Sequence, residues 1–179
     1  LIVIGNAVGF LLDYLKEDNF DVISIGKIND IFNGTGITQS IKTTSNHDGI
    51  KKTLEKMNKD FTGLCFINLN DFDTQFGHRR DVAGYAKCLE EFDAFIPDLL
   101  KALQKDDLFI ITADHGNDPT HVGTDHTREN VPVIIYSKKH QSNGPIQLLS
   151  SFADIGHTIS DNFQTKKPKI GQSFLDRLN

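Results

Sequence analysis

Apolar positions in the first third of the chain predict two helices with a strand between them. Residues 9–17 carry apolar side chains at helical spacing, and the short run 20–25 that follows is typical of a strand. Residues 29–46 are rich in Gly, Ser, Thr and Asn, which favours a loop. Either Asn46 or Asp48 then caps a second helix, so helix and strand already alternate here.

The same alternation continues through the rest of the chain. The short apolar segment 63–69 predicts a strand buried on both faces, as in a parallel sheet. Between residues 82 and 104 apolar side chains recur every three or four positions, which predicts an amphipathic helix that Pro97 can bend. Its inward residues are expected to be Leu89, Phe92, Ile96, Leu99 and Leu103. Two further strands and a late helix are predicted at 108–112, 131–136 and 152–163. The expected fold is α/β, with a largely parallel sheet flanked by helices.

Composition narrows the class of protein. A chain of 179 residues with 38% hydrophobic and 24% charged residues suits one globular domain. No apolar run approaches the roughly 20 residues that span a bilayer, and the first residues lack the basic start of a secretory signal, so we expect a cytoplasmic protein with no membrane partner. The net charge of -5 comes from interspersed acids without a basic stripe, which argues against nucleic acid as a partner. Cys65 and Cys88 show no metal or redox spacing and are predicted to be reduced, buried thiols.

Carboxylate and imidazole side chains gather where the predicted strands end. The candidates are Asp73 and His78 after one strand, Asp114 and His115 after the next, and His126 on the loop before the strand that follows. In an open parallel sheet the loops at the carboxyl ends of the strands converge, so three loops can deliver these five side chains to one place. An Asp–His pair alone is more often a helix cap or a loop hydrogen-bonding unit, and the set of five makes a metal centre the better interpretation.

The ligand types indicate the chemistry. Oxygen and imidazole ligands without thiolates suit manganese, zinc or a magnesium-like ion and argue against a structural zinc site. Two such ions can hold a phosphoryl group during in-line displacement. Nearby acids are expected to be hydrogen-bonding partners or solvated loop residues rather than ligands: Asp71, Asp118 and Asp125. Three arginines adjoin the ligands and either clamp a phosphate or form structural salt bridges: Arg79, Arg80 and Arg128.

Three runs carry a resemblance to a known family. Residues 67–81, 112–118 and 123–129 strongly resemble the corresponding motifs of phosphopentomutases, in the alkaline phosphatase superfamily. Thr-Ala-Asp-His-Gly-Asn is shared with cofactor-independent phosphoglycerate mutases, whereas Asp-Phe-Asp-x-x-x-Gly-His-Arg-Arg-Asp and Gly-Thr-Asp-His-Thr-Arg-Glu look particular to phosphopentomutases. With shorter matches at 25–28, 45–49 and 171–175, the resemblance covers nearly the whole chain.

The resemblance implies a ligand set and a reaction. It implies that one manganese ion is bound by Asp73, His78 and His126, and that Asp114 and His115 contribute to a second. Lys27 matches a lysine expected near the bound sugar phosphate, although from the residues alone it is an ordinary surface lysine. The family interconverts ribose or deoxyribose 1-phosphate and 5-phosphate in nucleoside catabolism. It does so through a phosphothreonine and a sugar bisphosphate, which also serves as activator.

The chain also departs from the family. An N-terminal aspartate ligand, the threonine nucleophile and an inserted cap domain have no counterpart in it, and it begins at Leu1 with Met57 as its sole methionine. We therefore expect residues 1–179 to form the C-terminal portion of the phosphatase-like core, inactive when isolated. The alternatives are another phosphomutase or hydrolase of the superfamily, such as a phosphoglycerate mutase, and a non-catalytic metal-binding module. The metal loaded, the preferred pentose and the oligomeric state stay open.

Overall fold

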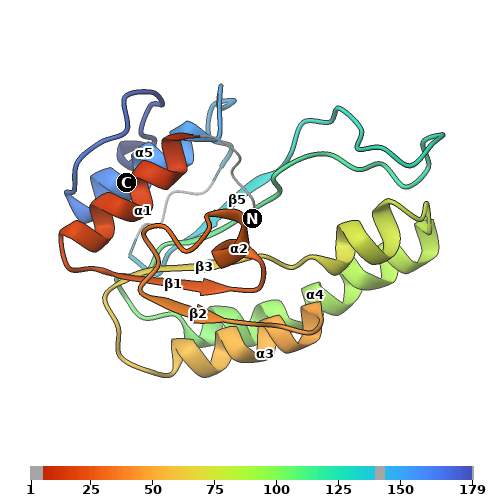
Figure 1. The fold of residues 1–179 in the computed structure, drawn as a ribbon, viewed down its shortest axis with the longest axis horizontal. Coiled ribbons are helices and arrows are strands. Elements are labelled where there is room, and N and C mark those ends of the chain that lie inside the picture. Colours follow the sequence, from red (N-terminus) through yellow and green to blue (C-terminus); the bar gives the residue numbers. More distant parts are fainter. Residues whose placement is uncertain (1–5, 140–143, 179) are drawn as a thin grey trace.

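The computed structural model describes residues 6–139 and 144–178, which form an α/β fold with helices on both faces of a parallel sheet (Figure 1). Within these ranges the strands are β1 (Asp21–Ile25), β2 (Gln39–Ile41), β3 (Gly63–Ile67), β4 (Phe109–Thr112) and β5 (Val133–Tyr136). The helices are α1 (Asn6–Glu17), α2 (Ile28–Ile31), α3 (Asn46–Met57), α4 (Val82–Ala102) and α5 (Ala153–Phe163), with a π-helix η1 (Phe72–Gly77) and a 3-10 helix η2 (Leu175–Leu178). The predicted fold class is confirmed.

The strands fall into two sheets. β2, β1 and β3 form a parallel sheet in that order, with Ile25 opposite Ile67 at the carboxyl ends of β1 and β3. β4 and β5 form a separate antiparallel pair, in which Thr112 lies opposite Val133. Since adjacent carboxyl ends of parallel strands lie at one edge, the segments after β1 and β3 emerge together.

Two predictions for residues 29–46 need correction. This segment is not all loop, because it contains the end of α2 and the three-residue strand β2. The cap of α3 is Ser45, not Asn46 or Asp48: its side chain accepts a hydrogen bond from the Asp48 backbone N–H at 3.1 Å. β2 has two exposed residues out of three, so its sequence lacks the apolar signal of a strand.

The predicted helix over residues 82–104 is confirmed as α4, and it continues through Pro97. Near the start of α4 the buried residue lies one position earlier in the sequence than predicted. Leu89 is 50% exposed, whereas Cys88 is buried and accepts a hydrogen bond from Asn46 Nδ2. Leu99 and Leu103 are buried as expected.

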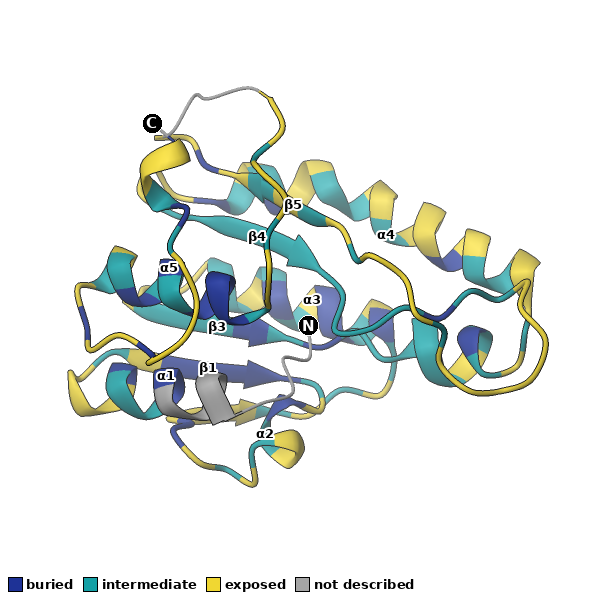
Figure 2. Cartoon of the chain, turned by 90° about the horizontal axis from the view of Figure 1, so that it is seen from above, coloured by how far each residue is buried: buried dark blue, intermediate teal, exposed yellow. Residues whose placement is uncertain are grey.

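Two apolar cores lie on either side of α5. The first packs α1 against the parallel sheet and includes Leu11, Leu12 and Val22. The second packs one face of β4 and β5 against Ile155 and Phe174. Ile159 of α5 contacts both cores, so this helix joins the two sheets. Figure 2 shows β1 as the most deeply buried strand.

The remaining sequence predictions concern the thiols and the membrane. Cys65 and Cys88 are free; burial raises the pKa of Cys65 to about 11 and also raises the pKa of Cys88. Cys88 is buried as predicted, and Cys65 is half-buried. Among the described residues, no helix combines the length and the apolar character needed to cross a bilayer.

Candidate metal centre

The π-helix η1 brings Asp73 and His78 together. In a π-helix residues five apart are joined by the backbone hydrogen bond, and His78 N donates to Asp73 O at 3.0 Å. The two side chains therefore lie one turn apart on the same side. His78 Nε2 is 3.2 Å from Asp73 Oδ2. The sequence places both residues after a strand, and the π-helix explains why their side chains meet.

The connection between β4 and β5 supplies the other candidates. Asp114 and His115 directly follow β4, and a β-bridge between Gly116 and Thr127 then brings the returning chain alongside. A Cβ on Gly116 would lie 2.5 Å from Glu129 Cβ, so this close approach requires glycine. The bridge places His126 beside His115, and their rings stack with centroids 3.6 Å apart. These residues belong to one long connection rather than to two crossover loops, because β4 and β5 are antiparallel.

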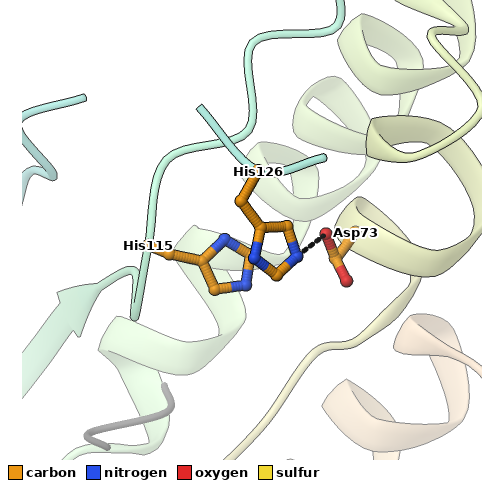
Figure 3. A group of neighbouring side chains, drawn as sticks. All are labelled: Asp73, His115 and His126. Carbon is orange, nitrogen blue, oxygen red and sulfur yellow. Dashed lines mark ion pairs between the residues drawn. The ribbon is translucent and has the colours of Figure 1, made fainter. Parts of the chain in front are cut away.

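The two segments converge on one point (Figure 3). His126 Nε2 is 3.4 Å from Asp73 Oδ1 and 3.1 Å from His78 Nε2. In the part of the chain that the structure describes, one ligand atom from each of Asp73, His115 and His126 lies within 4.8 Å of the others. The predicted closeness of residues 73 and 126 is therefore present, and their role as ligands stays a prediction.

These distances fit a bound cation. Ligands about 2.0–2.2 Å from an ion and about 90–110° apart are themselves separated by about 2.8–3.6 Å. His78 Nε2 lies 3.2 Å from Asp73 Oδ2, His126 Nε2 lies 3.4 Å from Asp73 Oδ1, and the two Nε2 atoms are 3.1 Å apart. Each distance is in the range for two ligands of one ion, and the two histidines face different oxygens of the same carboxylate.

The hydrogen bonds of His78 set its tautomer. Its Nδ1 lies 2.6 Å from Thr124 O, and because a carbonyl can only accept, Nδ1 carries the proton of the neutral ring. Nε2 then presents a lone pair toward the Asp73 carboxylate, where only a proton or a cation between them makes the contact favourable. This is the arrangement of a histidine ligand whose other nitrogen is fixed by a carbonyl.

Asp114 and His115 form a second pair, in which one carboxylate oxygen has no hydrogen-bond partner among the described residues. Asp114 Oδ2 is buried without a hydrogen bond and lies 3.4 Å from His115 Nε2. His115 Nδ1 is 3.1 Å from Gly116 O, so its Nε2 also carries a lone pair in the neutral ring. Two electron-rich atoms that face each other at a half-buried position fit a cation. Because the stacked rings of His115 and His126 are only 17° from parallel, their lone pairs do not meet at one ion, which favours a second ion at Asp114.

Other predicted residues have structural hydrogen bonds. The Asp71 carboxylate accepts from Asn46 N at 2.7 Å, and Asp118 Oδ1 accepts from Thr120 N and Oγ1, whose hydrogen bonds lower the pKa of Asp118. Lys27 is exposed at the carboxyl end of β1, beside the strand that leads to Asp73. Gly26, with φ of +83°, makes the turn before it, where a Cβ would lie 2.5 Å from Asn68 O.

The sequence does not predict the hydrogen bonds that Arg80 and Asn117 make near the proposed ligands. Arg80 donates to backbone carbonyls and to Asn117 Oδ1, and among the described residues it forms no ion pair with a carboxylate; its role as a phosphate clamp stays a prediction. Asn117 Nδ2 donates to Asp73 Oδ1 at 2.7 Å. The motif Thr-Ala-Asp-His-Gly-Asn contains Asn117, but spacing alone does not indicate that it supports a residue of another segment.

The fold and the site agree with the comparison to known families. A family model described as the metalloenzyme superfamily matches residues 13–167, and the chain therefore belongs to this superfamily. Among solved structures, the chain is similar to a phosphoglycerate mutase from Leishmania mexicana studied at low cobalt concentration, with a TM-score of 0.68 and 18% sequence identity. The match covers 90% of this chain and 38% of the mutase chain, so a shared fold extends over well under half of that protein.

Proposed function

We propose that this chain is the C-terminal part of a manganese-dependent phosphopentomutase, which interconverts (deoxy)ribose 1-phosphate and 5-phosphate. Membership of the metalloenzyme superfamily supports metal-dependent phosphoryl chemistry, and the resemblance of residues 67–81 and 123–129 supports the pentose substrate. The observation that carries the proposal is the convergence of Asp73, His78 and His126, within 3.1–3.4 Å, on a site that a cation fits.

Each residue has a proposed role. Asp73, His78 and His126 hold one divalent cation, and Asp114 with His115 contributes to a second. When bound, the ions neutralise charge on the transferring phosphoryl group and on the attacking and leaving oxygens. Lys27, at the same edge of the sheet, binds the sugar phosphate. The threonine nucleophile is expected outside these 179 residues, and a sugar bisphosphate is the expected activator.

Metal binding tests the site directly. Free Mn²⁺ is measured by electron paramagnetic resonance while it is titrated into the 179-residue chain and into two variants. His126→Ala removes a proposed ligand and should weaken binding by at least the roughly 10- to 100-fold that loss of a group supporting a ligand costs. His121→Ala is the matched control, because this histidine lies on the same connection and is exposed. Equal affinity of the His126→Ala variant and the original chain would contradict the proposed site.

The substrate is tested on the protein purified from its natural source. Ribose 1-phosphate, deoxyribose 1-phosphate and 3-phosphoglycerate are compared with Mn²⁺ and the matching bisphosphate present. The proposal expects isomerisation of the pentose phosphates and no turnover by the 179-residue chain alone. Preference for phosphoglycerate would assign a different mutase, and turnover by the chain alone would refute the expected position of the nucleophile.

A further inference from the structure

Arg80 lies two residues after the proposed ligand His78, at the point where the chain turns into α4. Its backbone has φ of +55°, the left-handed conformation that an arginine rarely adopts. Its side chain reaches the connection between β4 and β5 and donates to five oxygens. These acceptors are the carbonyls of Gly77, Asp118, Gly123 and Asp125 and Oδ1 of Asn117. One guanidinium therefore joins the π-helix segment to the connection that carries His126.

The first branch of this network leads to Asp73. Arg80 Nη1 donates to Asn117 Oδ1 at 2.6 Å, and Asn117 Nδ2 donates to Asp73 Oδ1 at 2.7 Å. Because a guanidinium can only donate, it fixes the amide with its oxygen toward Arg80 and its NH₂ group toward the carboxylate. Asn117 is only 9% exposed, so water competes little for these bonds. Arg80 thus sets the orientation of the carboxylate through one intermediate side chain.

The second branch leads to the histidines. Arg80 donates to the carbonyls on both sides of Thr124, those of Gly123 and Asp125. Thr124 O accepts from His78 Nδ1, and His126 follows two residues later. The backbone that fixes the tautomer of His78 and carries His126 is therefore held in place by the same guanidinium.

From these contacts we infer that Arg80 is a positioning residue for the proposed metal site, acting on Asp73 through Asn117 and on His78 and His126 through the Thr124 backbone. The inference rests on the proposed function, because it requires the site to bind a cation. The planar guanidinium of Arg80 has several N–H donors in fixed directions, so it donates to Asn117 and to the backbone around Thr124 at the same time. The single ammonium group of a lysine does not do this.

The test is Mn²⁺ affinity of the 179-residue chain, measured at a temperature where circular dichroism shows each variant folded in EDTA. Arg80→Gln should weaken binding by about 10- to 100-fold, the range for loss of a group that supports a metal ligand. Arg80→Lys should stay within about threefold of Arg80→Gln. Arg79→Gln is the matched control, since Arg79 is the adjacent arginine and is exposed, and its affinity should match the original chain.

A double-mutant cycle separates positioning from general stability. If Arg80 acts on Asp73 through Asn117, the loss in Arg80→Gln/Asn117→Ala should be smaller than the product of the two single losses. Unchanged affinity in Arg80→Gln would overturn the inference, and losses that multiply fully would overturn the branch through Asn117. Should Arg80→Gln not fold, Asn117→Ala decides alone, and unchanged affinity in that variant overturns it.

The outcome for the proposed function is read separately. Strong binding that His126→Ala abolishes and Arg80→Gln does not change leaves the proposed site standing and removes only the role of Arg80. Absence of Mn²⁺ binding by the original chain removes both.

Discussion

At the scale of single residues, the support of the metal site depends on close packing as well as on hydrogen bonds. Gly77 lies against Asn117: a Cβ at this position would be 2.5 Å from Asn117 Nδ2 and 2.9 Å from its Cγ. The backbone of Gly77 has no left-handed φ, so alanine is excluded there by space and not by conformation. A methyl group would displace the amide that donates to Asp73.

We expect Gly77→Ala to weaken Mn²⁺ binding by about tenfold or more and to lower the free energy of unfolding by about 1–3 kcal/mol through overpacking. Affinity and urea unfolding are measured on the same samples. Gly156→Ala is the control, because the nearest atom to its added Cβ, Leu11 Cδ2, is 3.9 Å away. Gly77→Ala with the original affinity would show that the amide of Asn117 moves without consequence for Asp73.

The ligand residues themselves could be predicted from the sequence, and their supporting contacts could not. Asp73 and His126 are found from their place near strand ends and from the motifs around them. Asn117 and Arg80 interact across 37 positions of sequence, through a left-handed residue and a connection without regular structure. Hydrophobic periodicity does not predict such contacts, because they depend on how irregular segments of the backbone fold back on each other.

At the scale of elements, Asp154 links the start of α5 to the segment before η2. Its buried carboxylate accepts from Ser150 N, Ser151 N and Gln172 N. Burial alone would raise the pKa of Asp154, but these hydrogen bonds together bring it below its usual value of 3.8. A carboxylate whose pKa is lower in the folded than in the unfolded state stabilises the fold at any pH above its unfolded-state pKa. This stabilisation is lost as the pH falls through its folded-state pKa.

We expect Asp154→Asn to lower the free energy of unfolding at pH 7 by about 1–3 kcal/mol, because the amide offers one oxygen where the carboxylate offers two to the N–H groups of Ser150, Ser151 and Gln172. The difference from the original chain should shrink as pH falls below 3.8 and through the lower pKa of the folded carboxylate, where the folded protein takes up the proton. Urea unfolding between pH 7 and 2.5 in EDTA measures both effects. Asp176→Asn, at an exposed position of η2, is the control. A difference that is constant across this pH range would contradict the prediction.

The sequence predicts most elements well and their details less well. Apolar runs locate β1, β3, β4 and β5, but a strand's own residues do not reveal its direction, so the antiparallel pair was not anticipated. The face of α4 is misassigned at Leu89, which is exposed although Tyr85 and Phe92 on the same face pack on Phe72, with ring centroids 5.8 and 6.5 Å away; at this level the inward contact is that of Cys88 with Asn46 of α3. Phe72 belongs to η1, a π-helix that spacing rules do not predict.

At the scale of the whole molecule, the proposed site is built from segments that belong to two different sheets. Asp73 and His78 follow β3 of the parallel sheet, and His115 and His126 belong to the connection within the antiparallel pair. A cation bound by both segments stabilises the native state only, since the ligands are far apart in the unfolded chain. Mn²⁺ at about 100 times its dissociation constant should therefore raise the free energy of unfolding by about 2.7 kcal/mol.

Thermal unfolding with Mn²⁺ and with EDTA measures this stabilisation, and Mg²⁺ at equal concentration tests the preference for manganese. The increase in the free energy of unfolding caused by Mn²⁺ should vanish in His126→Ala and persist in His121→Ala. An increase that is the same in both variants would place the bound ion elsewhere.

Because Asp73 and His126 are distant in the chain, an ion held between them closes a long loop of polypeptide, as a covalent cross-link would. The rate at which proteases reach β4 and β5 would accordingly depend on the supply of metal. The lifetime of the folded protein would therefore follow the concentration of the ion.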